Sequence, residues 1–155
     1  MGLKSNRQGE AQLLAEWLTT QASGAQAKTH VFVGKQTLVF AGAPISPARM
    51  RAFQVWSDWA DARVAWSAEV WIVEAKIVGT AGAYGQVLDY CNQYPQSLDY
   101  QDFGGRIIRP VVLCAYERPD TALYFSRFGV RTIVFTPAWA EKSLEVKIFG
   151  SAVDL

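Results

Sequence analysis

The sequence predicts an α/β fold in which helices flank a mixed central sheet. Residues 70–78 (VWIVEAKIV) form an apolar run of strand length, and both of its alternating faces are largely apolar, which is typical of a central strand covered on both sides. Residues 111–116 (VVLCAY) form a second such run. A helical pattern at 119–128 and a strand pattern at 131–136 follow it, and this short strand-helix-strand order indicates a parallel crossover.

The composition is that of one globular domain. The chain has 155 residues, 50% of them hydrophobic, so residues 1–155 can bury a substantial core as a single domain. The formal net charge is only +1, which excludes a general basic surface, so any binding of nucleic acid must be local. Cys91 and Cys114 lack metal-ligand spacing and indicate reduced thiols. The sequence has neither a signal core nor a membrane-spanning apolar stretch, which predicts a cytoplasmic protein without a membrane partner.

The N-terminal part of the chain predicts a helix, extended segments and a second helix. Residues 1–9 are polar and are expected to form a flexible tail, whereas residues 10–22 carry apolar side chains at helical spacing. Two extended runs at 30–33 and 37–40 predict a strand or hairpin. A helix is expected over 47–56, because a serine precedes a proline at its first position.

The strand pattern that starts at Arg63 is separated from the central run by only a few residues, which implies an antiparallel hairpin. A symmetric turn of even length would place Arg63 opposite Glu74, and Asp61 opposite Lys76. Asp61 would then share the face that carries Glu74 and Lys76. A turn of odd length, or a bulge, would move Asp61 to the other face.

The C-terminal half completes the predicted order of elements. A small-residue loop leads into a helix that ends near residue 93, and a polar segment follows at 95–109. Loops of that length more often have a function than not. A final helix is expected over 137–147. The whole order is helix, three strands, helix and strand, with an appended helix and strand and a C-terminal helix.

Two charges in the central run need an explanation. Glu74 and Lys76 share one face of a strand that is expected to be buried. Burial of an ionised group costs several kcal/mol unless the group is paired or binds a metal. The two residues therefore form either a structural ion pair or a functional site.

Further residues favour a site. Asp61 comes thirteen positions before Glu74-Ala75-Lys76, and Gln86 and Tyr90 follow on the next predicted helix. This arrangement resembles the PD-(D/E)xK nuclease superfamily, and the Gln-x-x-x-Tyr element is similar to that of its RecB-type branch. The resemblance covers roughly residues 10–116 and implies the αβββαβ core of a restriction-endonuclease-like fold. One departure is the alanine that precedes Asp61, where the family name has proline.

The resemblance implies Mg²⁺-dependent or Mn²⁺-dependent hydrolysis of DNA phosphodiesters. The metal ligands would be Asp61, Glu74 and the backbone carbonyl of Ala75, with the carboxylate of Glu10 as an additional ligand, because hard divalent cations prefer oxygen ligands. Lys76 would position or deprotonate the attacking water and offset phosphate charge.

The helix that follows would supply two more roles. Gln86 would orient the water or the scissile phosphate, and Tyr90, one helical turn further on, would contact the DNA backbone or support Gln86.

Alternative interpretations remain open at the level of sequence. Arg63, if it faces Glu74, could take the place of the metal and leave an inert site. The chain would then be a catalytically inactive nuclease-fold protein that binds DNA or serves as a phage virion or packaging module. As such a protein it would be associated with the virion, and it could assemble with phage structural proteins or with copies of itself. Glu74 and Lys76 could also be a structural ion pair in an unrelated α/β fold. His30, the one histidine, is interpreted as structural.

Overall fold

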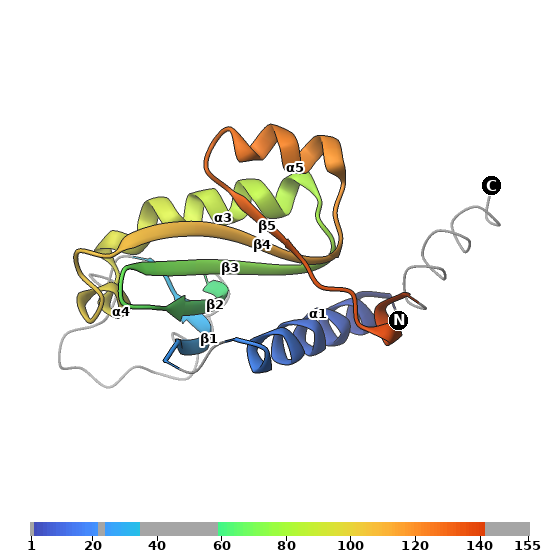
Figure 1. Cartoon of the computed structure of the whole chain (residues 1–155), viewed down its shortest axis with the longest axis horizontal. Helices are drawn as coiled ribbons and strands as arrows, with labels where there is room; N and C mark the ends of the chain where they lie inside the picture. The colour runs from blue at the N-terminus through green and yellow to red at the C-terminus, as the bar shows by residue number, and fades with distance from the viewer. Residues whose placement is uncertain (1, 22–23, 35–58, 142–155) are drawn as a thin grey trace, which may run out of the picture.

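The computed structural model describes residues 2–21, 24–34 and 59–141, which form a five-stranded mixed sheet flanked by helices (Figure 1). The predicted α/β class is therefore confirmed. The elements are α1 Gly2–Thr19, β1 Gln26–Phe32, β2 Trp59–Ala65, β3 Glu69–Val78, α3 Ala81–Gln93, the 3₁₀ turn η2 Tyr94–Gln96, α4 Leu98–Gln101, β4 Ile107–Tyr116, α5 Pro119–Ser126 and β5 Arg131–Val134. The predicted strand at 37–40, the helix at 47–56 and the C-terminal helix beyond 141 lie outside the described residues.

The strands follow one another across the sheet in the order β1-β2-β3-β4-β5. β1, β2 and β3 pair antiparallel, whereas β3, β4 and β5 pair parallel. The run at 70–78 is therefore the middle strand, as its two apolar faces predict. The parallel crossover through α5 is also confirmed, since β4 and β5 run in the same direction.

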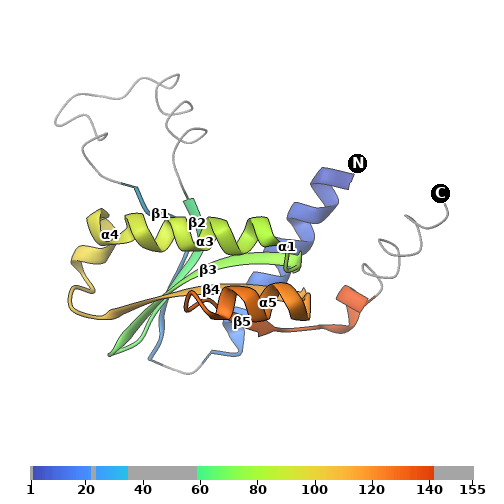
Figure 2. The same ribbon diagram turned by 90° about the horizontal axis from the view of Figure 1, so that it is seen from above.

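Helices cover the two faces of the sheet. α3 and α5 lie side by side on one face, and α1 lies on the other (Figures 1 and 2). Alternation along β3 divides its side chains between the two layers of the core. The layer under α1 contains Leu13, Trp17, Val73, Ala75 and Ile77, and the layer under α3 contains Val70, Ile72, Tyr84, Val87 and Val112. None of the helices in the described segments combines the length and the apolar character needed to cross a membrane.

The register of the β2–β3 hairpin differs from the prediction by two residues. The backbone N–H of Trp66 donates to the carbonyl of Glu69 at 2.8 Å, so the two-residue loop lies one position earlier than expected. Moving such a loop by one position shifts every cross-strand pair by two. Arg63 therefore pairs with Ile72, and the expectation that it opposes Glu74 is wrong. An even shift keeps each side chain on its face, so Asp61 stays on the side of Glu74.

Two other boundaries differ from the sequence-based expectations. α1 is helical from Gly2, where a flexible tail over 1–9 was expected, and it ends at Thr19. β4 begins at Ile107, so the predicted polar loop is shorter and contains η2 and α4. Pro110 lies within β4, where it pairs with β3, but the pairing of β4 with β5 begins only at Val111. The proline can therefore direct its missing N–H toward the unpaired side of the strand.

Candidate functional site

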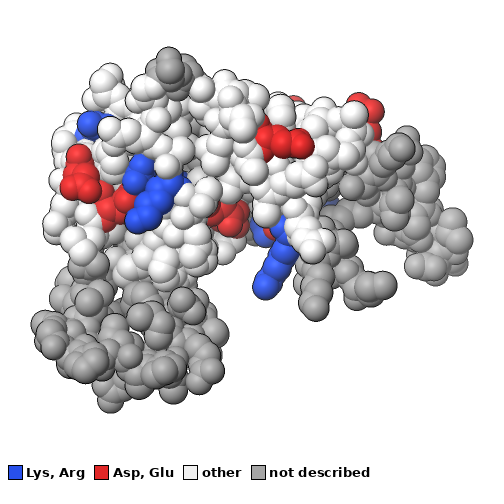
Figure 3. Space-filling model, turned by 90° about the horizontal axis from the view of Figure 1, so that it is seen from below, with Lys and Arg blue, Asp and Glu red and all other residues white. Residues whose placement is uncertain are grey.

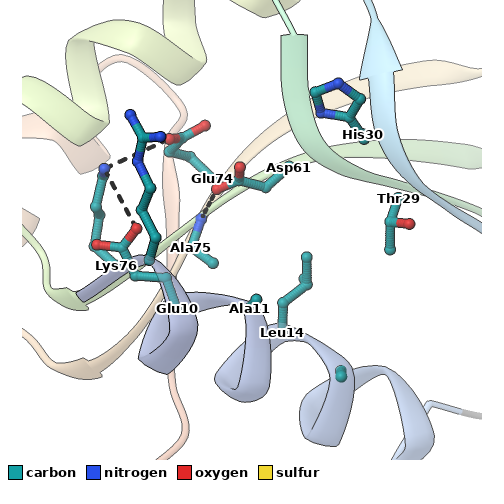
Figure 4. Close-up of a pocket in the computed structure, with 11 residues that line it drawn as sticks. Glu10, Ala11, Leu14, Thr29, His30, Asp61, Glu74, Ala75 and Lys76 are labelled. Atoms are coloured by element: carbon teal, nitrogen blue, oxygen red, sulfur yellow. Dashed lines mark hydrogen bonds and ion pairs between the residues drawn. The ribbon is translucent and has the colours of Figure 1, made fainter. Parts of the chain in front are cut away.

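A pocket of about 640 Å³ is lined by residues of α1, β1, β2 and β3, on a face where acidic and basic side chains are interspersed (Figures 3 and 4). We call it the carboxylate pocket. Its ionisable residues are Arg7, Glu10, His30, Asp61, Glu74 and Lys76, and Ala75 also lines it. The structure thus brings together all the residues that the sequence suggested as metal ligands, together with the lysine.

The end of the β2–β3 ladder positions Asp61. The two strands pair as far as Ala62 and Val73, and both continue beyond that point. Beyond that point the Asp61 side chain accepts a hydrogen bond from the backbone of β3 in place of a backbone carbonyl of β2. The N–H of Ala75 donates to its Oδ2 at 2.8 Å (Figure 4). This bond fixes the Asp61 carboxyl beside Glu74, the residue that precedes Ala75.

Glu74 is the most buried charged group of the pocket. Its side chain is only 6% exposed, and no donor in the described part of the chain reaches its Oε2 atom. A buried acceptor without a partner costs the full desolvation of that atom, about 1–3 kcal/mol and more when the group is charged. A proton or a cation at Oε2 would remove this cost.

The two carboxyls interact strongly with each other. Burial, followed by the negative charge of Asp61, raises the pKa of Glu74 to about 8. Burial also raises the pKa of Asp61, although the N–H of Ala75 and the charge of Lys76 oppose that change. The groups are close enough to share a hydrogen bond when one of them is protonated. A buried and a half-buried carboxylate side by side therefore favour a shared proton or a nearby cation.

Lys76 supplies only part of the compensating charge. Its Nζ lies 3.8 Å from Oε2 of Glu10 on α1, and 3.9 Å from Oε1 of Glu74. Both distances are too long for strong hydrogen bonds, and the lysine side chain is 33% exposed. The ammonium is thus partly accessible to solvent and to a negatively charged ligand.

The donor set suits a divalent cation that keeps several waters. In the described segments no group of three or more His, Cys, Asp or Glu side chains is arranged to hold a metal ion. Asp61 and Glu74 do converge, while Glu10 is directed to Lys76. Mg²⁺ is commonly held by one or two carboxylates and completes its shell with waters and substrate phosphates, so these two residues are the ones that could hold it. The roles of Glu10 and of the Ala75 carbonyl as ligands remain predictions.

Arg63 does not neutralise the pocket. It is buried on another part of β2, where Nε and Nη2 donate to Asp99 at 2.8 and 3.0 Å, and Nη1 donates to the carbonyl of Gln26 at 2.6 Å. The guanidinium also lies 4.5 Å from the centre of the Phe103 ring. Burial acts to raise the pKa of Asp99, but the hydrogen bonds from Arg63 and Tyr94 outweigh it and lower that pKa. Arg63 and Asp99 are thus a structural pair.

The predicted helix residues lie elsewhere. Gln86 and Tyr90 are on α3, which covers the sheet face opposite α1, and neither lines the carboxylate pocket. The Gln86 amide donates instead to the Tyr90 hydroxyl, as expected for residues one turn apart on a helix. Their roles toward water, phosphate or DNA remain predictions.

Sequence reasoning missed two ionisable residues of the pocket, Arg7 and His30. Arg7 was assigned to a flexible tail, but it lies one helical turn before Glu10, so a longer first helix would have placed both on one face. His30 was interpreted as structural. In the structure it has a backbone φ of 56° and stands at the pocket wall beside Asp61 (Figure 4). Nothing in the local sequence indicated that conformation.

Comparison of the chain with protein-family models, with curated proteins and with solved structures gives no match, so the site has to be interpreted from its own geometry.

Proposed function

We propose that this chain is a Mg²⁺-dependent or Mn²⁺-dependent deoxyribonuclease with a restriction-endonuclease-like fold of the PD-(D/E)xK type. The observation that carries the proposal is the carboxyl pair of buried Glu74 and half-buried Asp61, in which one oxygen of Glu74 has no donor among the described residues. A metal ion would supply the missing positive charge. The lysine of the predicted Glu-x-Lys motif stands beside the pair.

The order of elements supports the same proposal. The described chain runs α1, β1, β2, β3, α3 and β4, with Asp61 on β2 and the Glu-x-Lys motif on β3. This is the αβββαβ order that the sequence resemblance implies. The sheet brings the aspartate and the glutamate together across neighbouring strands, as a shared metal site requires.

The residues of the pocket would divide the chemistry among them. Asp61 and Glu74 would hold the divalent cation, which would offset the negative charge that grows on the phosphorus and the leaving oxygen and help to activate water. The N–H of Ala75 keeps Asp61 in place. Lys76 would orient the attacking water and bind a phosphate oxygen, since its ammonium is at the open side of the pocket.

The first test measures cleavage and metal binding on the same variants. Supercoiled, linear and single-stranded DNA would be incubated with Mg²⁺ or Mn²⁺, and Mn²⁺ binding would be followed by electron paramagnetic resonance. We expect Glu74→Gln to lose both binding and cleavage, and Lys76→Ala to lose cleavage while it still binds Mn²⁺. Glu69→Gln, which changes a half-buried glutamate on the same strand that does not line the pocket, should retain both.

One observation supports a second candidate, an inactive nuclease-fold module that binds DNA or assembles with phage structural proteins. Lys76 already bridges Glu10 and Glu74, so part of the acidic charge is compensated within the chain. DNA association that survives Glu74→Gln, in a protein that cleaves no form of DNA with either metal, would support this candidate and refute the nuclease.

A further inference from the structure

A second pocket, of about 380 Å³, adjoins the carboxylate pocket and shares His30 with it. We call it the aromatic pocket. The residues that matter for its chemistry are Lys28, His30, Phe32, Trp59, Asp99 and Asp102. Its volume is within the range of sites that hold small organic groups.

Three flat rings are arranged around this pocket. The His30 ring stacks on the Trp59 ring with 4.4 Å between their centres and an angle of only 6° between their planes. Phe32 packs against the same tryptophan at 5.4 Å and 47°. His30 itself is exposed, so its ring presents an aromatic surface between the two pockets. An exposed aromatic ring can stack on a nucleobase of any type, so such a surface binds bases without selecting a nucleotide sequence.

The backbone holds His30 in a conformation that few residues other than glycine adopt. Its φ of 56° is the one positive value at a non-glycine residue in the described segments. The β1–β2 ladder pairs Thr29 with Ala62 and Val31 with Ala60 on either side of it, so regular pairing on both sides maintains the unusual conformation. Strain of this kind persists where neighbouring structure fixes it, and it is concentrated at functional sites.

The proposed hydrolysis sets which end of a nucleotide lies in which pocket. The carboxylate pocket has the carboxyls of Glu10, Asp61 and Glu74 as well as the cationic side chains of Lys76 and Arg7, and the proposed chemistry requires the phosphate beside Lys76. The aromatic pocket has Lys28, Asp102 and Asp99, and Arg63 already pairs with Asp99, so no excess of positive charge holds a phosphate there. A nucleotide that spans the boundary would therefore place its phosphate beside Lys76 and its base against His30.

We infer that the stacked pair of His30 and Trp59 is a subsite for an unpaired nucleobase next to the cleaved phosphate, and that the substrate is single-stranded DNA. This inference rests on the proposed nuclease function, which supplies the phosphate position. Bases inside a duplex have both faces covered by their neighbours, whereas a base of a single strand can leave its stack at a much lower cost.

The test measures binding without metal, so it does not depend on catalysis. Fluorescence anisotropy would compare two labelled oligonucleotides of about 12 nucleotides, one with normal bases and one with abasic residues and the same phosphates. We expect wild-type protein to bind the first about tenfold more tightly, an amount within the range for one stacked base.

Two substitutions of His30 give the matched comparison. His30→Asn removes the ring but suits a left-handed backbone, and it should abolish the difference between the two oligonucleotides. His30→Phe restores a ring and should restore the difference. Arg7→Ala should weaken both oligonucleotides by the same factor, because it removes a phosphate contact and no base contact. Thermal melting would establish that each variant is folded.

Equal binding of the two oligonucleotides by wild-type protein would overturn the subsite. A difference that persists in His30→Asn, or that fails to return in a folded His30→Phe, would do the same. The nuclease proposal fails separately: base-dependent binding by a protein that never cleaves DNA would leave the subsite and remove the catalysis. Cleavage of DNA by a protein that binds both oligonucleotides equally would support the nuclease and rule out the subsite.

Discussion

Replacement of Glu74 by glutamine should stabilise the metal-free protein near neutral pH. The folded-state pKa of Glu74 is raised from 4.5 to about 8 by burial and by the charge of Asp61. Between these two values the folded chain keeps a proton that the unfolded chain has released. Stability therefore falls as pH rises through this interval. Glutamine cannot ionise, so the variant does not have this loss.

The size of the effect follows from the pKa difference. At about pH 7 the loss relative to pH 4.5 is about 3 kcal/mol, since each pH unit contributes about 1.4 kcal/mol. The side chain is only 6% exposed, so solvent screening reduces this figure little. The pKa of about 8 already includes the attraction of Lys76, and the protonated carboxyl forms no ion pair with it, so glutamine loses no ion pair near neutral pH. We expect a net gain of about 3 kcal/mol, or a rise in Tm of about 6–12 °C.

Thermal denaturation followed by circular dichroism, with EDTA present, would measure the effect at about pH 4.5 and pH 7. The two proteins should have the same Tm at the lower pH, and the variant should have the higher Tm at the upper pH. Glu69→Gln is the matched control on the same strand. A hydrogen bond from Trp71 lowers the pKa of Glu69, so its replacement should give no gain. A Glu74→Gln variant that melts below wild type near pH 7, or an equal gain at both pH values, would refute the reasoning.

Two further predictions concern neighbouring groups. Asp61→Asn should lower the pKa of Glu74, because it removes the second largest cause of the raised value, and carbon-detected NMR titration of the carboxyl would measure this; an unchanged pKa would contradict it. Arg63→Ala should destabilise the fold by about 3–5 kcal/mol, because it leaves Asp99 buried without its partner, and urea denaturation would measure the loss. Asp99→Asn combined with Arg63→Leu should recover part of that loss, and no recovery would mean that the ion pair is not its source.

The parts of the fold that could be predicted were those specified by local sequence. Alternating apolar side chains on both faces of residues 70–78 identified the central strand, and the residues that surround it in sequence identified the crossover through α5. The meeting of Asp61 and Glu74 could be inferred although the register was wrong, because an error of two residues leaves each side chain on its face.

The parts that could not be predicted depend on contacts between distant residues. The partner of Arg63 is Asp99, 36 positions away, on a short helix in a segment that had no clear periodicity. The left-handed conformation of His30 arises within the β1–β2 ladder and has no signal such as a glycine. Arg7 was missed for a simpler reason: the residues before Glu10 are polar and show no apolar helical pattern, so the start of α1 was placed too late.

The unsatisfied oxygen of Glu74 would link the proposed metal binding to proton release. Arg63 is bound to Asp99, and Lys76 faces Oε1, so neither group satisfies Oε2. The pKa of Glu74 is raised to about 8, and a divalent cation at the proposed site would have to displace the proton, because metals bind the ionised carboxylate. The apparent affinity for Mg²⁺ should therefore rise by up to about tenfold per pH unit below pH 8 and then level off. Calorimetric titrations in buffers of different ionisation enthalpy would measure the released proton, and an affinity that stays constant between about pH 6 and pH 8 would show that a cation does not compete for this oxygen.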